Sequence, residues 1–274
     1  MCLVLFARSA RPTRGAPLPL VVLANRDEFF ARPTAASDFW GDGRGERTVL
    51  AGRDLEKGGT WLGVTRAGRF ACVTNVRAPA ARREGRSRGA LVADFLAGEP
   101  VGPDRGDAPA RDYLRALRAE EYPSFNALFF DGEELLYARD DDAPGAATGL
   151  RFHPVADGVH GVSNGRLDDP WPKVVRGVAR LTEWLEGPMD LDDAFDLLAD
   201  REAVDDGELP HTGVPLELER ALAPAFVALP GYGTRASTVV VLHASGELSF
   251  AERAYGERGR VISERRESWR APLG

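Results

Sequence analysis

The stretch that decides the fold is the first apolar run of the chain, CLVLFA at residues 2–7, directly after the initiator methionine. Its length and composition predict a buried β-strand. Methionine aminopeptidases remove Met1 when the next side chain is small, and Cys2 would then carry a thiol and a free α-amine. These groups titrate near ~8.5 and ~7.7–8.0, so the amine can accept the thiol proton and Cys2 forms a complete nucleophile. The alternative is a cysteine that serves only as a small hydrophobic residue of a buried strand.

Strands and helices are expected in alternating blocks along the chain. Apolar runs and turn signals predict strands at 3–7, 19–24, 60–65, 69–75, 125–130, 135–138, 237–242 and 248–250. Helical spacing predicts helices from the cap Ser87 to Gly98, at 110–120, at 172–186 and at 191–201. Two antiparallel sheets packed face to face, with helices outside each, would bury all of these apolar faces. The expected fold is an α+β, four-layer αββα sandwich formed by a single domain, residues 1–274.

Composition excludes several functional classes. The formal charge of −7 argues against nucleic acid as a partner, because phosphate binding requires a basic surface. The opening run is interrupted too soon by Arg8 to be a secretory signal, and no stretch approaches the ~18 residues of a membrane span. We therefore expect a cytoplasmic protein. The 2 cysteines and 4 histidines lack metal-ligand spacing, so we expect neither a metal site nor a cofactor. The oligomeric state is left open.

Polar residues follow or precede several of the predicted strands. Asn25, Arg26, Asp27 and Glu28 come directly after the apolar run 21–24. The other candidates are Asn75, Asn164 and Arg235, each next to a strand-like run. Buried ionisable groups are costly without partners, so this arrangement favours a functional cleft. Taken separately, each could also be a surface turn, an ion pair of little energy or a cap of the sheet edge.

Together these positions form a longer pattern. The matching stretches are MC at 1–2, ANRDEF at 24–29, RPT at 32–34, FW at 39–40, AGRD at 51–54, GGTWLG at 58–63, TN at 74–75, SRG at 87–89, DFL at 94–96, SN at 163–164, WPK at 171–173 and YGTR at 232–235. In this pattern the sequence resembles the NRDE-domain family, also called the transport and Golgi organisation protein 2 family. The resemblance implies an N-terminal nucleophile hydrolase-like sandwich, in agreement with the layers expected from the strand and helix pattern.

The family is similar to cysteine-type amidases that use an N-terminal cysteine, an arginine and an aspartate after the second strand, two asparagines and a late arginine. Carried over, the resemblance implies catalytic roles for six residues: Cys2, Arg26, Asp27, Asn75, Asn164 and Arg235. One departure is that Arg26 and Asp27 are adjacent here, whereas two residues separate the pair in the amidases. Asn25 and Glu28 could therefore occupy those places, because neighbouring strand residues point to opposite faces.

The implied function is hydrolysis of a non-peptide amide or a thioester of a small acyl substrate by the Cys2 thiolate. Side-chain amides of Asn75 or Asn164 would hold the oxyanion. Arg26 or Arg235 would lower the pKa of the thiol. Trp61, with Trp40 and Phe29, would line an apolar acyl pocket or belong to the core. We expect Asn25, Glu28 and Trp61 to contact the substrate.

The competing hypothesis is a non-catalytic protein that binds or transports haem, lipid or acyl-CoA, which the resemblance also permits. Fold alone does not decide between the two. The arginine-rich stretch from Arg77 to Arg88 could attract a carboxylate or phosphate of such a ligand. Its other arginines are Arg82, Arg83 and Arg86. The simpler interpretation is a solvated surface loop.

Overall fold

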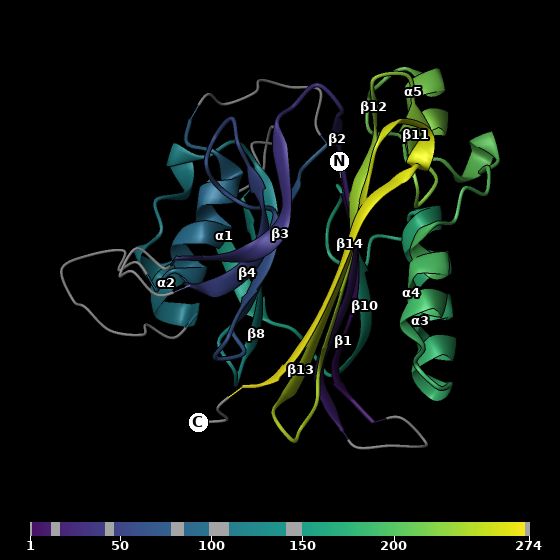
Figure 1. Cartoon of the computed structure of the whole chain (residues 1–274). Coiled ribbons are helices and arrows are strands. Elements are labelled where there is room, and N and C mark those ends of the chain that lie inside the picture. The colour runs from purple at the N-terminus through teal and green to yellow at the C-terminus, as the bar shows by residue number, and fades with distance from the viewer. Residues whose placement is uncertain are drawn as a thin grey trace. The chain divides into compact units, whose positions relative to one another are not determined.

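The computed structural model describes residues 2–11, 17–41, 47–77, 85–98, 110–140 and 150–271. The chain forms two compact units, each built on one β-sheet with helices on one of its faces (Figure 1). Unit 1 comprises Met1–Ala31, Arg77–Pro79 and Ala156–Trp269. Unit 2 comprises Arg32–Val76, Ala80–Val155 and Arg270–Gly274.

The sheet of unit 1 has the first strand of the chain near its centre. Its strand order is β10-β1-β2-β12-β13-β14, and β11 also pairs with β12. The strands are β1 (Cys2–Ala10), β2 (Leu18–Phe29), β10 (Gly158–Val162), β11 (Ala228–Leu229), β12 (Tyr232–Leu242), β13 (Glu247–Tyr255) and β14 (Val261–Arg270). Strand β2 is the longest at 12 residues and is paired antiparallel on both sides, with β1 and with β12.

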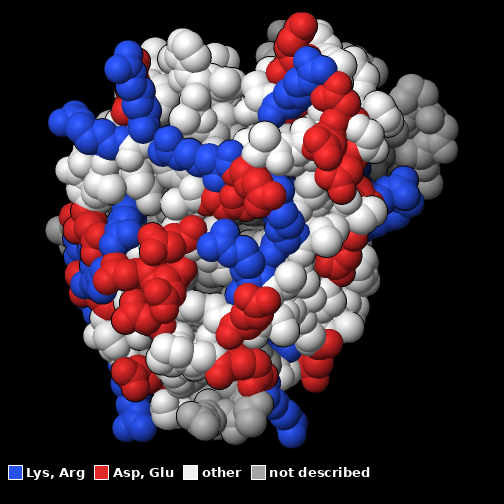
Figure 2. Space-filling view, turned by 90° about the vertical axis from the view of Figure 1, so that its right-hand side faces the viewer, with Lys and Arg blue, Asp and Glu red and all other residues white. Residues whose placement is uncertain are grey.

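One face of this sheet is covered by α3 (Pro172–Glu186) and α4 (Leu191–Leu198), whereas α5 (Leu216–Leu222) lies between α4 and β11 in the sequence. The helices bury apolar side chains such as Leu181 and Phe195 against Leu5, Leu23 and Val239 of the strands. Their outer sides carry intermixed acidic and basic side chains (Figure 2). Both helices are therefore amphipathic, and burial of the apolar side holds them on the sheet.

Two glycines allow α3 to approach the sheet closely. A Cβ atom on Gly177 would lie 2.6 Å from Leu5 Cδ1, and one on Gly161 would lie 2.8 Å from Val174 Cγ1. Larger residues at either position would push the helix away from β1 and β10. The first turn of α3, which carries Lys173, is thereby held against the strands.

Unit 2 contains the second sheet, in the order β3-β4-β5-β6-β7-β8-β9. Its elements are β3 (Thr34–Gly41), β4 (Arg47–Asp54), β5 (Leu62–Thr65), β6 (Phe70–Asn75), α1 (Arg88–Leu96), α2 (Ala110–Ala116), β7 (Phe125–Phe130), β8 (Leu135–Asp140) and β9 (Arg151–Pro154). Ser87 caps α1 by accepting a hydrogen bond from the Gly89 N–H at 3.2 Å. Phe95 of α1 and Tyr113 of α2 pack on Phe129 and thereby cover one face of the sheet.

The α+β class, the antiparallel sheets and the placement of helices on each sheet are confirmed. Strands β1, β5, β6 and β7 and helix α3 lie where the sequence pattern predicts them. The pattern did not detect β3, β4, β14 or α5. The Pro/Gly/Asp-rich stretches near 99–109 and 140–149 are expected to be loops; they lie outside the described residues, except for Asp140, which ends β8. Within the described ranges, no helix is both long enough and apolar enough to span a membrane.

The single domain expected for residues 1–274 stays a prediction. It can be tested because each unit is formed by stretches that are separate in the sequence. Unit 1 joins Met1–Ala31 to Ala156–Trp269, so neither unit is one continuous piece of sequence. We expect one cooperative unfolding transition for the whole chain. The double variant Trp40→Phe/Trp61→Phe keeps tryptophans only in unit 1, and the triple variant Trp171→Phe/Trp184→Phe/Trp269→Phe keeps them only in unit 2. Urea unfolding followed by tryptophan fluorescence should have the same midpoint in both variants. Two separate midpoints would show that the prediction is wrong.

Candidate active site

The register of β1 against β2 places the predicted tetrapeptide beside the start of the first strand. Cys2 pairs with Arg26, and Leu3 pairs with Asn25. Strand β1 begins at Cys2, whereas β2 continues to Phe29 and stays paired with β12. Strand β1 therefore begins next to a two-stranded ribbon of β2 and β12, and Asp27 is the first position of β2 beyond the Cys2–Arg26 pair.

The four side chains of the tetrapeptide alternate between the two faces of the sheet. Arg26 and Glu28 lie on one face, where Arg26 Nη2 is 3.9 Å from Glu28 Oε2. Asn25 lies on the face that α4 covers, as its hydrogen bonds show, and alternation places Asp27 on that face too.

The Asn25 side chain is fully engaged inside unit 1. Its Nδ2 group donates to Leu198 O and to Ala225 O, both at 2.8 Å. Its Oδ1 atom accepts from Ser237 Oγ at 2.6 Å. These bonds join β2 to the end of α4, to the segment before β11 and to β12. The amide thus has a positioning role in the core of the unit.

Asp27 is a buried carboxyl group, only 2% exposed. Its Oδ1 atom accepts from Thr234 Oγ1 at 2.7 Å, and Thr234 Oγ1 accepts in turn from the Val227 N–H at 2.9 Å. Burial raises the pKa of Asp27, while the charges of Lys173 and Arg26 and the bond from Thr234 act in the opposite direction. The ionisation of Asp27 therefore depends on the cations that surround it.

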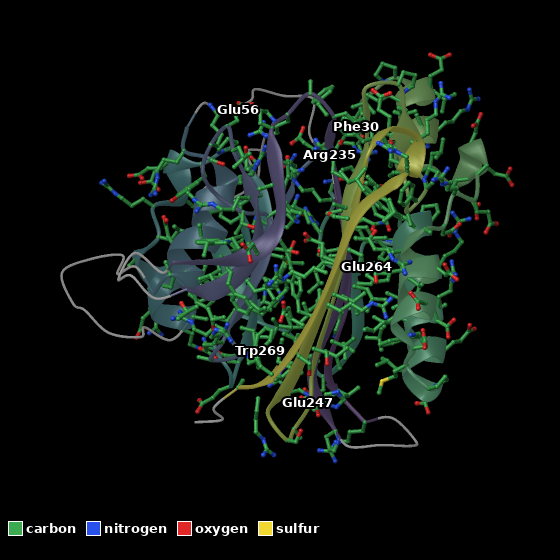
Figure 3. The ribbon with its side chains drawn as sticks, in the orientation of Figure 1. Phe30, Glu56, Arg235, Glu247, Glu264 and Trp269 are labelled. Carbon is green, nitrogen blue, oxygen red and sulfur yellow. The ribbon has the colours of Figure 1, made fainter. Side chains whose placement is uncertain are left out.

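Arg235 occupies a bulge in β12, at the end of the ribbon. The register moves from the pair Thr234–Asp27 to the pair Ala236–Arg26, so Arg235 has no direct partner on β2. Its Nη1 atom donates to Phe29 O at 2.8 Å, and its guanidinium lies 5.5 Å from the centre of the Phe30 ring (Figure 3). Burial lowers the pKa of Arg235 and the charge of Glu28 raises it.

Asn164, the second candidate oxyanion donor, follows β10 in unit 1 and is buried. Its Oδ1 atom accepts from Ser163 Oγ at 3.4 Å, and its main-chain O accepts from the Arg77 N–H at 2.9 Å. Asn164 thus belongs to the same unit as Cys2 and is fixed through its main chain by Arg77.

Asn75 and Trp61 belong to unit 2. Asn75 is the last residue of β6, opposite Phe125, and is half-buried. Trp61 precedes β5 and its carbonyl oxygen accepts from the Val73 N–H at 2.9 Å. A part for either residue in a site with Cys2 stays a prediction.

The arginine-rich stretch is partly within the described residues. Arg86 forms an ion pair with Asp94 at 2.9 Å, and Arg88 donates to Ser124 O at 3.1 Å. Both bonds lie inside unit 2. Arg82 and Arg83 lie outside the described residues.

Unit 1 also buries Lys173 and Glu219, which the sequence did not indicate as site residues, and Arg77, which was considered only as part of the arginine-rich stretch. Lys173, in the first turn of α3, donates through Nζ to Leu222 O at 2.9 Å. Arg77 Nη1 lies 2.6 Å from Glu219 Oε2 of α5, and these side chains are only 6% and 4% exposed. Burial lowers the pKa of Arg77, and the charge of Glu219 raises it. One available signal was that Lys173 is one of just two lysines in the chain, the other being Lys57.

In the part of the chain that the structure describes, no three His, Cys, Asp or Glu side chains lie close enough together to hold a metal ion.

Comparison with known proteins gives a family, relatives of similar sequence and a solved structure of similar fold. The sequence model of the family described as Transport and Golgi organisation 2 matches residues 1–257. The Transport and Golgi organization protein 2 homolog of Bos taurus is 34% identical over 277 aligned residues, covering 93% of each chain. The Homo sapiens homolog is 30% identical with the same coverage. Among solved structures, the Caenorhabditis elegans N-acylethanolamine-hydrolyzing acid amidase ortholog aligns with a TM-score of 0.51 at 12% identity, covering 88% of this chain and 92% of that chain.

The bonds of Asn25 predict a structural effect. Asn25→Ala leaves the carbonyls of Leu198 and Ala225 and the hydroxyl of Ser237 without this partner, so we expect a loss of about 2–4 kcal/mol in the free energy of unfolding. Urea unfolding measures the loss. Glu183→Ala, on the exposed side of α3, is the control and should unfold like the unmodified chain. A stable Asn25→Ala protein would mean that the amide does not hold the unit together.

The buried ion pair gives a second prediction. Arg77→Met leaves Glu219 buried without its cation and should lower the free energy of unfolding by about 3–5 kcal/mol. Adding Glu219→Met to that variant should recover much of the loss, because no unpaired charge then remains. Arg220 lies next to Glu219 on α5 and forms an exposed ion pair with Asp206. Arg220→Met should therefore change the free energy of unfolding little. Equal losses in the Arg77 and Arg220 variants would contradict a buried pair.

Proposed function

Because this chain belongs to the Transport and Golgi organisation 2 family and has an N-terminal nucleophile hydrolase-like fold, we propose that it is a cysteine hydrolase that uses its mature N-terminal residue. The substrate is a non-peptide amide, or a thioester, of a small acyl group. The observation that carries the proposal is the register that pairs Cys2 with Arg26 and places buried Asp27 at the next position. The resemblance expected from the sequence motifs is thus confirmed at the level of family and fold.

The reaction begins when the α-amine of Cys2 takes the thiol proton. The thiolate attacks the substrate carbonyl and forms a tetrahedral oxyanion, which the side-chain amide of Asn164 stabilises. The protonated amine then gives its proton to the leaving nitrogen, the C–N bond breaks, and the acyl group remains on sulfur as a thioester. Water, activated by the same amine, hydrolyses the thioester and releases the acid.

In this mechanism different charged residues act on the thiol and on the α-amine of Cys2. Arg26, which pairs with Cys2 in the ladder, lowers the pKa of the thiol by placing positive charge near it. Asp27, which follows on the strand and lies on the opposite face, holds the protonated α-amine. In this mechanism Arg26 and Asp27 do not both need to face the thiol. Arg235 closes the end of the ribbon through the carbonyl of Phe29 and adds positive charge there.

A second candidate is favoured by the family's name. On this hypothesis the protein is a non-catalytic carrier of haem, lipid or acyl-CoA, and Cys2 is a small residue of the first strand. Both hypotheses use the same fold, and they differ in whether Met1 is removed and whether the thiol reacts.

Intact-mass analysis with a thiol-directed electrophile tests the proposal. We expect a mature protein without Met1 that takes one label rapidly. Cys2→Ala should abolish this labelling, whereas Cys72→Ala, which removes the buried cysteine of β6, should not. Arg26→Met should slow the labelling at neutral pH, because less thiol is ionised.

Turnover of a chromogenic acyl-amide gives the functional measurement. Cys2→Ala should remove turnover, and Asn164→Ala should reduce kcat by about 10²–10³-fold through the loss of an oxyanion donor. Retained Met1, a slow thiol and no turnover would sink the hydrolase proposal. A shift of melting temperature by haem, acyl-CoA or lipid in such a protein would support the carrier.

A further inference from the structure

The segment after β10 folds back along the outer edge of that strand. Among the described strands of its sheet, β10 is the last at one end, next to β1. At this edge the Asp168 N–H donates to Gly161 O at 2.8 Å, and the Gly161 N–H donates to Asp168 Oδ1 at 2.9 Å. The two bonds join positions 161 and 168 and enclose residues 162–167. This segment contains Asn164, the candidate oxyanion donor.

The other carboxylate oxygen of Asp168 bonds to the side chain of His160 on β10. His160 Nδ1 lies 2.8 Å from Asp168 Oδ2, and His160 Nε2 lies 3.1 Å from the carbonyl oxygen of Ala156. Both ring nitrogens therefore face an acceptor. A neutral imidazole has one N–H group, whereas an imidazolium has two. Since only the imidazolium can donate to both oxygens, this geometry favours the protonated ring.

Strand β1 favours the same protonation state. Phe6 is the residue of β1 opposite His160, and the two rings stack with their centres 5.5 Å apart and their planes at 29°. Phe6 is fully buried, and the His160 side chain is 15% exposed. A cation beside the face of an aromatic ring is attracted by the quadrupole of that ring. The phenyl ring thus stabilises the imidazolium from the side of the sheet.

Asp168 is the charged group that bonds to the ring. The other charged residues of β1, of β10 with the turn before it and of the segment before α3 are Arg8, Asp157, Arg166 and Asp169. Arg8 donates to the carbonyl of Pro19 on β2, the strand on the other side of β1, at 3.4 Å. Asp169 accepts through Oδ2 from the Arg166 N–H at 2.5 Å. Asp157 precedes β10 and is exposed.

We propose that the ion pair of His160 and Asp168 is a pH-dependent clamp on residues 162–167, and that both are positioning residues for Asn164. The clamp stands by itself, whereas the effect on Asn164 as oxyanion donor rests on the proposed function. Asn164 is 1% exposed, and its main-chain oxygen accepts from the Arg77 N–H at 2.9 Å. Displacement of the enclosed segment would therefore move a buried amide group.

The pH range of the clamp follows from the two titrating groups. The bond to Asp168 raises the pKa of His160, and burial acts in the opposite direction. Burial alone would raise the pKa of Asp168, but the bonds from His160 and from the Gly161 N–H outweigh it and lower that pKa. The clamp is thus complete between the lowered pKa of Asp168 and the raised pKa of His160. It weakens as the pH rises through the pKa of His160, because the neutral ring keeps one of its two bonds.

Asp168→Asn is the sharpest variant. Asp168 has a φ of 60°, a conformation that asparagine also adopts. The asparagine oxygen can accept from the Gly161 N–H, and its amide can donate to a neutral His160 ring that donates in turn to Ala156 O. The pH dependence should then disappear while the bonds remain. His160→Asn removes the titration directly and serves if Asp168→Asn does not fold. The control is His211→Asn, at an exposed histidine of unit 1.

The direct test is NMR titration of 15N-labelled histidine in the full-length protein, with the resonances of His160 assigned from His160→Asn. In the unmodified chain this ring should titrate above the ordinary value of about 6.5. Asp168→Asn should lower its pKa by at least one pH unit, a tenfold change in protonation, and His211→Asn should leave it in place. An unmodified His160 that titrates at or below the ordinary value would overturn the proposal.

Amide hydrogen exchange measures the clamp itself. In the unmodified chain the protection factors of the Gly161 and Asp168 amides should fall by about 2–10-fold as the pH rises through the His160 titration, as expected for one lost hydrogen bond. They should stay constant over that range in Asp168→Asn and in His160→Asn. A purely structural pair would lower protection equally at every pH when it is changed. That result would overturn the proposal.

Turnover of the chromogenic acyl-amide separates this inference from the proposed function. A misplaced oxyanion donor lowers kcat and leaves KM unchanged. The ratio of kcat in the unmodified chain to kcat in Asp168→Asn, in which the titrations of Cys2 cancel, should fall as the pH rises through the His160 titration. A constant ratio with pH-dependent protection would overturn the link to Asn164 and leave the hydrolase intact. No turnover in either protein, with the expected ring titration, would sink the hydrolase proposal and support the clamp.

Discussion

The hydrogen-bonded register of β2 with β1 on one side and β12 on the other is the constraint on which the candidate site depends. It pairs Cys2 with Arg26 and Asp27 with Thr234, so a change by one residue would move every polar group to the opposite face. Asn25 helps to hold this register, because its amide bonds reach α4, the segment before β11 and Ser237 of β12. The pairing of Cys2 with Arg26 thus depends on a buried amide one position away in the ladder.

The charges next to that ladder give the site its chemical character. Arg26 and Asp27 face opposite sides of the sheet, and in the proposed mechanism one of them acts on the thiol and the other on the amine. The helical layer adds Lys173 and the Arg77–Glu219 pair, which lie in the part of the unit where α3 and α5 begin or end. The helices therefore contribute fixed charge to the site in addition to covering the sheet.

Apolar periodicity found the strands and helices whose faces are buried, including β1, β7 and α3. It failed where charge dominates the sequence. Strand β14 alternates Glu and Arg along SERRES at 263–268, and α5 is LELERAL at 216–222, so neither presents an apolar run. Arg26 and Asp27, which were expected to follow the second strand, lie within β2, and Asn164 follows β10. The burial of Lys173 depends on the distant end of α5, and the bonds of Asn25 depend on residues 198, 225 and 237; no local pattern carries such information.

The discontinuous path of unit 1 has a consequence for biosynthesis. Strand β2 receives β12 only after residue 232 has been translated, so the emerging N-terminal segment waits on the ribosome without its neighbour in the sheet. In the proposed function, the removal of Met1 by an aminopeptidase can therefore take place before β2 pairs with β12.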